Sequence, residues 1–579
     1  MLVCLIFKDL LLERAVGMSE VCVELVGKLV GEMLGLSKEE LSPSDNLISL
    51  GLGSLDIMRI AGLLTKNGCN VTFSELVSNP CMASWVNFAR ERSARSSSNG
   101  SPLLGSANYS KGDPFPITSV QHAYMVGRRD GQELGGTACH AYMEFECGSL
   151  DAAKLERAVE LLILRHPMLR ARFSDDGTAR IEDKVTWKGL TTYRVEGAGN
   201  PDSRIEGIRQ ELSHLRFDIE QDDLIDVRLT VVSPKRTIMH INVDLLAADV
   251  LSIQVLLEDL AHLYDGTDLA PIEIDFMEYA RRTGIGEDAR NEDREYWLNR
   301  IDNMPGGPSL PLKAPMESVK RSQFTRMEYL IDSKSWKNFT EKGRQIGVTQ
   351  SMGIAAVYAK ALSRWSEDKK FLLNLPLFNR KPIHPDVDKI VSDFTSLILL
   401  EADCANAISL LELASQMQGR FQQDVAHSSF GAVEVLRELS HRCPNDPKKA
   451  PVVFASNIGT QFISNKVEDV FGPLSKMLAE TPQVLLDHQI YDHKNGLLLA
   501  WDYVSELLDD KIAKQMFEAY CTAVRFYCEN DWSEPFPDLL PPSQRAARAE
   551  ANSEGADLGG GTLHGRFFAR AQAEPDAPA

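Results

Sequence analysis

The stretch that most constrains this chain is residues 91–113, "ERSARSSSNGSPLLGSANYSKGD", which are rich in serine, glycine and asparagine. Segments of this composition form flexible tethers because they have too few apolar side chains to join a core. A tether at this place divides the chain into a small unit, residues 19–90, and a large one, residues 114–541. The first is long enough for one small bundle, and the second is long enough for two lobes.

Residues 19–90 have the pattern of a helical bundle. The first expected helix has apolar residues at helical spacing, namely Val21, Leu25, Leu29 and Met33. A loop, a second amphipathic helix, a short helix, a proline break and a last helix follow before the tether. We therefore predict a four-helix module.

Residues 114–541 alternate between strand-like and helix-like segments. The strand "RTIMHINVDLL" leads into the helical "DVLSIQVLLEDLAHLYDG", and this order is typical of α/β or α+β proteins. A body of this length exceeds the size of one core. We place the seam near the proline-rich "NMPGGPSLPLKAP", which gives lobes at 114–290 and 291–541.

Composition excludes several classes of function. The chain has 82 acidic and 62 basic residues, a formal net charge of -20, and such a surface repels nucleic-acid phosphates. No apolar run has the length of a membrane span, and residues 1–18 lack the basic leader and cleavage site of a signal peptide. The ten cysteines occur singly without a CxxC pair, which indicates reduced thiols in the cytoplasm and no metal site.

The sequence "DNLISLGLGSLDIMR" raises the question of what Ser54 does. A serine at a loop-to-helix junction is most often an N-cap that satisfies free backbone amides. The alternative is an attachment point for a prosthetic group, whose phosphate the amides at a helix start attract.

The attachment reading is favoured because residues 20–88 resemble the carrier domains of assembly-line synthesis. The modifiable serine of that family lies in a Gly-Leu-Asp-Ser-Leu-type motif, and this chain has Gly53 where the family usually has aspartate. The resemblance implies 4'-phosphopantetheine on Ser54, attached by a phosphopantetheinyl transferase. A serine modified by another enzyme needs no general base of its own.

A series of motifs runs through the large unit. They are "FPITSVQHAYMVGR" at 115–128, "LRHPMLRARF" at 164–173, "DLLAADVLSI" at 244–253, "VSDFTSLILL" at 391–400, "APVVFASNIG" at 450–459 and "TPQVLLDHQIY" at 481–491. Together they resemble the heterocyclization domain of nonribosomal peptide synthetases. The related condensation domains have a His-His-x3-Asp-Gly motif where this chain has Asp244 and Asp249.

This resemblance implies both a fold and a reaction. The fold is a multidomain chain in which the helical carrier bundle precedes a two-lobed α/β body. Each lobe is like chloramphenicol acetyltransferase, and carrier arms enter a tunnel between the lobes from opposite faces. In the reaction, a carrier-bound acyl thioester is condensed with a cysteinyl, seryl or threonyl thioester, the side chain attacks the new carbonyl, and water is lost. The product is a thiazoline or an oxazoline.

Asp487 is the residue to which the resemblance assigns proton transfer during the loss of water. In the family an aspartate at this place acts with a threonine of a "PVVFTS" motif, and this chain has Ala455 at that position. Ser456 is the next hydroxyl along the strand, although alternation directs it to the opposite face. The candidate pair is therefore Asp487 with Ser456, and the alternative is Asp487 with a water.

Asp244 and Asp249 flank a strand-to-helix turn, where a buried carboxylate needs a hydrogen bond or a charged partner. They are candidates for the reaction, and the alternative is that arginine partners hold them in the tunnel floor. We expect five further residues in the tunnel wall, namely His140, Ser252, Asp393, Thr395 and Gln483.

The order of the segments predicts partners. A carrier at the start of the chain resembles the aryl carriers of siderophore synthetases of the pyochelin and yersiniabactin type, which implies loading by a stand-alone aryl-acid adenylating ligase. Residues 542–579 read as a linker and the start of an adenylation domain, so we expect downstream adenylation and carrier domains. Two alternatives remain, namely condensation or acyl transfer without cyclization, and a degenerate docking fragment without catalysis.

Overall fold

The computed structural model describes residues 22–37, 40–66, 69, 71, 73–95, 112–195, 200–283, 287–378, 380–381, 383–443, 448–553, 562 and 564–576. The chain forms two compact units, residues 1–537 and residues 538–579. The expected N-terminal extension at 1–18 and most of the expected tether at 91–113 lie outside the described residues.

The small helical module is present before the tether. It consists of the helical residues 22–34 and of α2 (Leu47–Leu50), α3 (Ser54–Lys66), α4 (Phe73–Ser78) and α5 (Met82–Arg95). Its core includes Val26, Leu29, Ile57 and Trp85, all buried. Met33, expected in this core, is 37% exposed, because the first helix turns a face centred on Val26 and Val30 inward.

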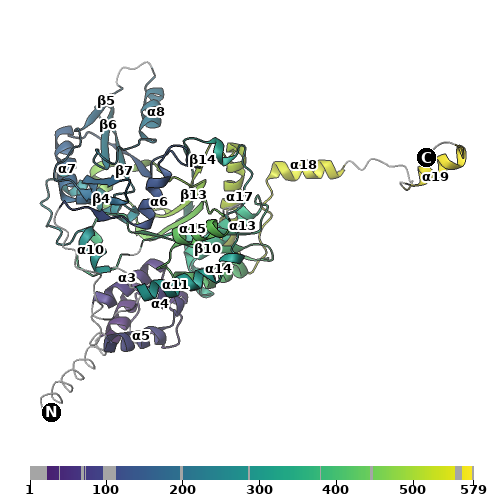
Figure 1. The fold of residues 1–579 in the computed structure, drawn as a ribbon, viewed down its shortest axis with the longest axis horizontal. Helices are drawn as coiled ribbons and strands as arrows, with labels where there is room; N and C mark the ends of the chain where they lie inside the picture. The colour runs from purple at the N-terminus through teal and green to yellow at the C-terminus, as the bar shows by residue number, and fades with distance from the viewer. Residues whose placement is uncertain are drawn as a thin grey trace, which may run out of the picture. The chain divides into compact units, whose positions relative to one another are not determined.

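The N-terminal lobe of the large body contains a five-stranded sheet in the order β12-β2-β7-β6-β5 and a small sheet in the order β1-β4-β3 (Figure 1). Its strands are β1 (Phe115–Pro116), β2 (His140–Cys147), β3 (Ala171–Ser174), β4 (Thr178–Ile181), β5 (Thr191–Arg194), β6 (Ile225–Ser233) and β7 (Arg236–Asp244). Its helices are α6 (Ser119–Gly127), α7 (Ala152–Arg165), η2 (Pro167–Arg170), α8 (Pro201–Leu212), α9 (Val250–Tyr264) and α10 (Phe276–Thr283).

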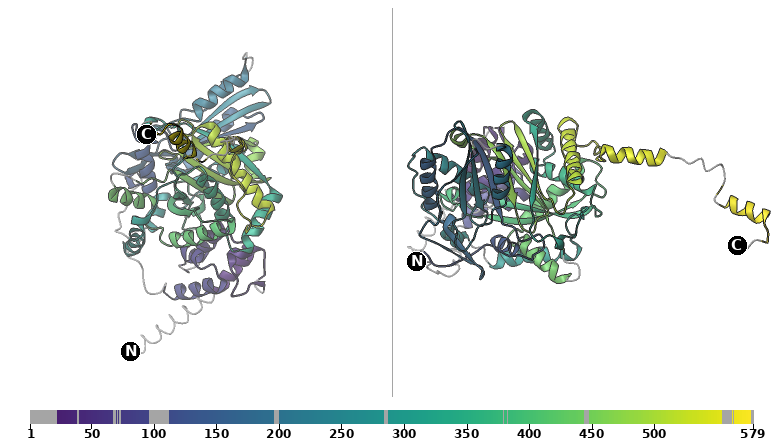
Figure 2. Two further views of the ribbon diagram at one scale, coloured as in Figure 1. Left: turned by 90° about the vertical axis from the view of Figure 1, so that its right-hand side faces the viewer. Right: turned by 90° about the horizontal axis from the view of Figure 1, so that it is seen from above.

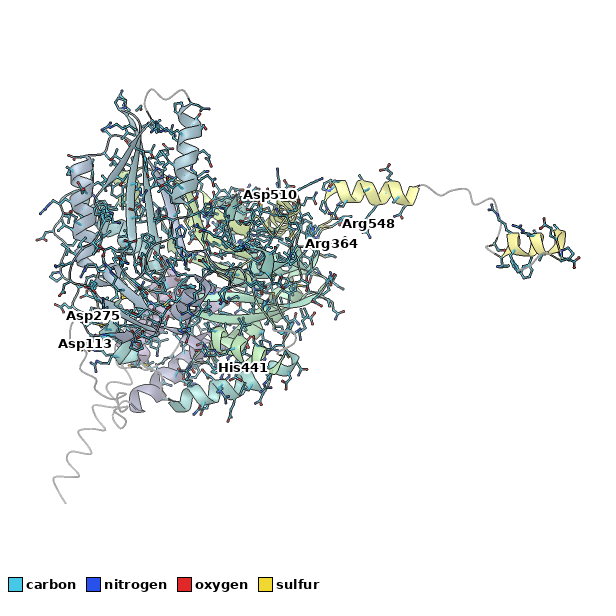
Figure 3. All side chains as sticks on the ribbon, turned by 45° about the horizontal axis from the view of Figure 1, so that its top comes forward. Asp113, Asp275, Arg364, His441, Asp510 and Arg548 are labelled. Atoms are coloured by element: carbon cyan, nitrogen blue, oxygen red, sulfur yellow. The ribbon has the colours of Figure 1, made fainter. Side chains whose placement is uncertain are left out.

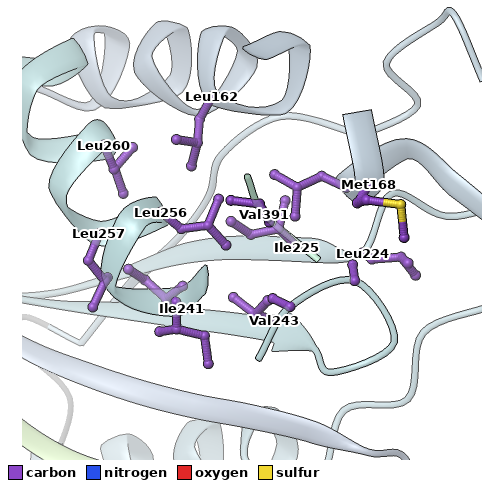
Figure 4. Close-up of a cluster of buried hydrophobic side chains, with 14 of the residues drawn as sticks. Leu162, Met168, Leu224, Ile225, Ile241, Val243, Leu256, Leu257, Leu260 and Val391 are labelled. Atoms are coloured by element: carbon purple, nitrogen blue, oxygen red, sulfur yellow. The ribbon is translucent and has the colours of Figure 1, made fainter. Parts of the chain in front are cut away.

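The core of this lobe lies between the sheet and helices α7 and α9 (Figure 4). Strand alternation points every second residue of β7 toward α9, and α9 has leucines at helical spacing on the facing side. The side chains that meet there are Leu162, Ile225, Ile241, Val243, Leu256, Leu257 and Leu260. This packing fixes the end of β7 and the start of α9, where Asp244 and Asp249 lie.

The C-terminal lobe contains a six-stranded sheet in the order β10-β9-β11-β13-β14-β8 (Figures 1 and 2). Its strands are β8 (Phe324–Asp332), β9 (Lys370–Phe378), β10 (Thr395–Asp403), β11 (Val452–Gln461), β13 (Leu486–His493) and β14 (Gly496–Val504). Its helices are α11 (Glu287–Leu298), η3 (Ile301–Asn303), η4 (Met316–Ser318), α12 (Ser333–Gln345), α13 (Gln350–Ser363), η5 (Val387–Lys389), α14 (Leu410–Val425), α15 (Ala432–Arg442) and α17 (Asp510–Glu529).

The second half of the chain also contributes to the first lobe. Strand β12 (Leu474–Glu480) pairs antiparallel with β2, and α16 (Asn465–Phe471) packs against α9. The helical module and the two-lobed α/β body agree with the predicted fold class. The predicted division at residue 290 omits this exchange, because a linear split assigns residues 465–480 to the C-terminal lobe alone.

Charged side chains occupy the outside of the fold, as Asp113, Asp275, Arg364 and Asp510 illustrate (Figure 3). In the parts of the chain that the structure describes, no helix combines the length and hydropathy of a membrane span. The second unit contains α18 (Pro542–Ser553) and α19 (Gly565–Ala573).

Candidate active site

A cavity of about 560 Å³ is lined by half of the candidate residues, namely Asp249, Asp393, Thr395, Gln483 and Asp487. The N-terminal lobe lines it with residues such as Tyr124, Ala141 and Asp249, and the C-terminal lobe lines it with residues such as Asn374 and Asp487. The cavity therefore has walls from both lobes, as the expected tunnel requires.

Asp487 lies in a row of residues that runs across the C-terminal sheet. Val453 of β11 pairs with both Asn374 of β9 and Asp487 of β13, and Asp487 pairs with Asp502 of β14. Because paired residues of neighbouring strands share a face, these side chains lie on one side of the sheet.

The Asp487 carboxyl has one occupied and one unoccupied oxygen. Its Oδ2 accepts a hydrogen bond of 2.5 Å from Gln489 Nε2. Its Oδ1 is buried and has no hydrogen-bond partner among the residues that the structure describes. Burial raises the pKa of Asp487 to about 7, and the nearby charge of Asp502 adds to this rise. A carboxyl with this pKa exchanges a proton readily at neutral pH.

Arg326 fixes the polar groups beside Asp487. Its Nε and Nη2 donate to the two oxygens of Asp502 at 2.7 and 2.6 Å, and Nη2 also donates to Gln489 Oε1 at 2.7 Å. This pairing orients the Gln489 amide so that its nitrogen faces Asp487. The arginine thus neutralises Asp502 and leaves Asp487 without a charged hydrogen-bond partner.

Asp393 and Thr395 line the same cavity, as predicted from the sequence. Asp393 Oδ1 accepts from the Thr395 amide at 3.0 Å, while its buried Oδ2 lacks a partner within the described ranges. Burial raises the pKa of Asp393 to about 7. Gln483 also lines the cavity, and its left-handed φ of 64° is held by a 2.7 Å bond from its amide to Leu134 O.

Asp244 and Asp249 are both ion-paired with arginines. Arg128 Nη1 lies 2.7 Å from Asp244 Oδ2, and Arg380 Nη2 lies 2.8 Å from Asp249 Oδ1. Asp249 also caps α9 by accepting from the Ser252 amide at 2.7 Å. Asp249 reaches the cavity wall, whereas Asp244 is not among the lining residues. This geometry agrees with the alternative in which arginine partners hold the two carboxylates in place.

Ser456 does not line the cavity that contains Asp487, contrary to the predicted pairing of these two residues. Alternation along β11 directs it to the face opposite Ala455, where its hydroxyl lies 2.7 Å from Ser351 Oγ. It lines a separate small pocket of about 60 Å³ rather than the large cavity.

The prediction that His140 and Ser252 lie in the tunnel wall is also corrected, because neither residue lines the cavity. The adjacent Ala141 faces the cavity, and His140 points to the other side of the sheet, where its Nε2 is 3.1 Å from Ser213 O. Ser252 is fully buried and exchanges hydrogen bonds with Ser392, donating to its carbonyl at 2.7 Å and accepting from its amide at 3.1 Å. Ser252 therefore fixes the segment that contains Asp393.

Sequence reasoning missed Asn374 and Tyr124. Asn374 lines the cavity, and its buried Oδ1 has no partner in the described part of the chain. The signal for Asn374 was a single amide in the otherwise apolar strand "FLLNLPLF". Tyr124 lies in "FPITSVQHAYMVGR", where helical periodicity alone does not distinguish a cavity residue from a core residue.

Ser54 lies at the start of a helix whose preceding residue, Gly53, borders a small pocket. Ser54 is the first residue of α3, and Asp56 Oδ2 accepts from the Gly53 amide at 2.9 Å, which supplies a carboxylate at the helix start. Gly53 lines the small pocket with Ser351 and Ser456, and the residues common to both cavities are Pro376, Phe378 and Asn457. Within the described ranges, no group of three or more His, Cys, Asp or Glu side chains is arranged to hold a metal ion.

Comparisons with known proteins match both parts of the chain. Residues 115–530 match the condensation domain family, and residues 24–89 match the phosphopantetheine attachment site family. The chain is 35% identical over 564 residues to a phenyloxazoline synthase of Mycolicibacterium paratuberculosis and 34% identical over 564 residues to a pyochelin synthetase of Pseudomonas aeruginosa. These matches cover 95% and 96% of the chain but only 48% and 39% of the relatives.

A solved structure agrees with these matches. The cyclization-docking bidomain of the EpoB nonribosomal peptide synthetase from Sorangium cellulosum superimposes with a TM-score of 0.66 at 30% identity. The superposition covers 72% of this chain and 86% of the bidomain.

Proposed function

Because this chain belongs to the condensation domain family of nonribosomal peptide synthetases and has a phosphopantetheine attachment domain ahead of that domain, we propose that it forms a heterocycle. A carrier-bound acyl thioester is condensed with a cysteinyl, seryl or threonyl thioester, and the product is cyclized and dehydrated to a thiazoline or oxazoline. The names of the two relatives, phenyloxazoline synthase and pyochelin synthetase, support an aryl donor and siderophore-like biosynthesis.

The observation that carries this proposal is the Asp487 carboxyl. It lies in the cavity lined by both lobes, its Oδ1 has no partner among the described residues, and burial raises its pKa to about 7. Condensation alone requires no group that protonates a departing hydroxyl, whereas dehydration does. A partly protonated carboxyl at this place suits the second task.

The chain's own residues divide the work as follows. The cavity walls surround the reacting groups, and Gln489, held by Arg326, orients Asp487. Asp487 protonates the hydroxyl that the cyclized adduct loses as water. Asp249, held by Arg380, and Asp244, held by Arg128, keep the strand-to-helix turn in place.

The attachment domain implies modification by a phosphopantetheinyl transferase. We propose Ser54 as the modified residue, and the bound group supplies a thiol that holds the acyl group as a thioester. The proposed further partners are a stand-alone aryl-acid adenylating ligase and downstream adenylation and carrier domains. The nine cysteines in the described parts of the chain form no disulfide, which supports synthesis in the reducing cytoplasm.

Reconstitution tests the proposal. The full chain is treated with a phosphopantetheinyl transferase and salicyl-coenzyme A, and peptide mapping checks that Ser54 is modified. Synthetic cysteinyl, seryl and threonyl pantetheine thioesters are then supplied as acceptors. Mass spectrometry is expected to show a product one water lighter than the open amide. An open amide as the sole product would contradict heterocyclization, and no product with any acceptor would contradict catalysis.

One observation favours the second candidate, condensation without ring closure. Ala455 lines the cavity where the resemblance places a threonine, and Ser456 faces away. The same mass measurement separates the two functions, because the second predicts only the open amide.

A further inference from the structure

Two aspartates in the wall of the same cavity each have one buried oxygen without a hydrogen-bond partner among the described residues. Asp393 Oδ2 and Asp487 Oδ1 are both buried and have no hydrogen-bond partner in the part of the chain that the structure describes. Tyr124, which also lines the cavity, is electrostatically influenced by both carboxyls. The two carboxyls therefore belong to the wall of one cavity and both act on the same phenol.

Each of these carboxyls lies near a second aspartate that is neutralised by an arginine. Beside Asp393, Asp249 is paired with Arg380 at 2.8 Å. Beside Asp487, Asp502 is paired with Arg326 at 2.6 Å. In both places the arginine is engaged by the neighbouring aspartate, so the cavity carboxyl retains a free oxygen.

Asp393 is also held in position from two directions. Ser252 at the start of α9 bonds to the carbonyl and the amide of Ser392, and Arg380 donates to Ser252 Oγ at 2.8 Å. On the other side, the Thr395 amide bonds Asp393 Oδ1. A side chain fixed this firmly in a cavity wall, with one buried oxygen left unpartnered in the described part of the chain, has the preorganisation expected of a group that acts on a substrate.

We propose that Asp393 is a second proton-transferring residue of ring closure, working opposite Asp487 in place of the absent hydroxyl at position 455. This inference rests on the proposed function and deepens it. Asp393 acts as the base and Asp487 as the acid.

The proton transfers balance with these two residues. When the acceptor side chain attacks the amide carbonyl, a C–S or C–O bond forms, Asp393 takes the thiol or hydroxyl proton, and Asp487 gives a proton to the carbonyl oxygen. The two residues then exchange protons through solvent and return to their starting states. In the second step Asp487 protonates the adduct hydroxyl as the C–O bond breaks and water leaves, Asp393 takes the N–H proton, and a C=N bond forms. A second proton exchange with solvent returns both residues to their starting states.

The hydrogen bonds decide which residue is the base. Asp393 Oδ1 accepts from the Thr395 amide, and the Thr395 side chain also acts to lower the pKa of Asp393, so Thr395 favours the ionised form. Among the described residues, Asp487 accepts from Gln489 alone, and the Asp502 charge favours its protonated form. Both have a pKa raised to about 7 by burial, so an ionised Asp393 with a protonated Asp487 is well populated at neutral pH.

Several titratable groups in the described part of the chain interact with the two carboxyls. Those that interact with Asp393 are Tyr124, Cys139, Asp249 and Arg380. Those that interact with Asp487 are Tyr124, Arg326, Tyr358, Tyr491 and Asp502. The arginines stay charged, and burial raises the pKa of each tyrosine and of Cys139, so the two carboxyls dominate the pH profile near neutrality.

Asp393→Asn tests the inference in the full chain, with salicyl on Ser54 and cysteinyl pantetheine thioester as acceptor. Single-turnover mass spectrometry follows the open amide and the ring separately. We expect accumulation of the open amide, ring formation slowed about 100-fold or more, and loss of the low-pH limb of the wild-type profile for ring formation. Asp393→Glu is expected to restore part of the rate, and Asp388→Asn, in the same segment but exposed, serves as the matched control.

The outcomes separate the inference from the function on which it rests. If wild-type protein forms the ring and Asp393→Asn matches it in rate and pH profile, Asp393 has no part in proton transfer. If Asp393→Asn slows the ring but retains both limbs of the profile, Asp393 is structural and the inference also fails. If wild-type protein never forms the ring, the proposed function itself is wrong.

Discussion

Asp249 and Asp487 line the same cavity from different lobes, and both are buried. Asp249 is ion-paired to Arg380 and caps α9, so its carboxylate interacts with other groups of the protein. Within the described ranges, Asp487 has one hydrogen bond, from the neutral amide of Gln489, and its other oxygen is buried without a partner. The comparison teaches that the local balance of charge, rather than burial or place in a motif, separates an aspartate that holds the fold from one available for chemistry.

Replacing the unpaired aspartate is expected to have the largest effect. Asp487→Asn keeps the shape but removes the transferable proton, so ring formation should fall about 10²–10⁴-fold while the open amide accumulates. Single-turnover mass spectrometry measures both products, with the exposed Asp469→Asn as control. A wild-type rate of ring formation in Asp487→Asn would remove the distinction between the two aspartates.

Replacing the paired aspartate is expected to act on stability instead. Asp249→Ala leaves the Arg380 side chain, which is only 4% exposed, without its charged partner, and such a loss costs about 3–5 kcal/mol of unfolding free energy. Urea unfolding measures this value, and Asp249→Ala with Arg380→Met should regain part of it. Equal unfolding free energies of Asp249→Ala and wild-type protein would show that the ion pair does not stabilise the fold.

The pH dependence of stability sharpens the comparison further. An aspartate in the unfolded chain ionises near pH 4, whereas Asp393 and Asp487 in the folded protein keep their protons up to about pH 7. Over that window the folded state binds more protons, so the unfolding free energy falls as the pH rises. Urea titrations at several pH values should show a shallower fall for Asp487→Asn than for wild-type protein, and identical slopes would argue against the raised pKa.

The smallest expected effect comes from the missing hydroxyl. Ala455 pairs with Gln489 and lines the cavity, so Ala455→Thr places a hydroxyl on the face that contains Asp487. One added hydrogen bond contributes about 0.5–1.5 kcal/mol, which corresponds to an acceleration of ring formation below about tenfold. Ala455→Val has the same shape without the hydroxyl and is the matched control. Equal rates for the two variants would mean that the hydroxyl has no role.

Motifs and alternation predicted much of the fold and part of the site. The two-lobed body was predicted from strand and helix patterns together with the resemblance. The direction of Ser456, away from the face of Ala455, was predicted from the alternation of β11. The sequence did not reveal that β12 joins the N-terminal sheet, because strand pairing over such a separation leaves no local pattern.

The misplaced residues have a common physical cause. His140 and Ser252 belong to elements buried on more than one side, where apolar and polar residues alternate without showing which face borders a cavity. Asn374 was missed for the same reason, since its strand is apolar on both faces. The sequence suggested that arginines pair with Asp244 and Asp249, but it did not identify which ones. Arg128 and Arg380 lie far from the two aspartates in sequence.

The most direct test of the central claim is an NMR titration of the full chain labelled at its aspartate carboxyl carbons. Comparison with Asp487→Asn and Asp249→Asn assigns the two resonances. The account predicts that the Asp487 signal titrates with a pKa near 7, well above the range of an exposed aspartate. An Asp487 signal that titrates near 4, as in an exposed aspartate, would contradict the claim that an unpaired, buried carboxyl is held ready to donate a proton.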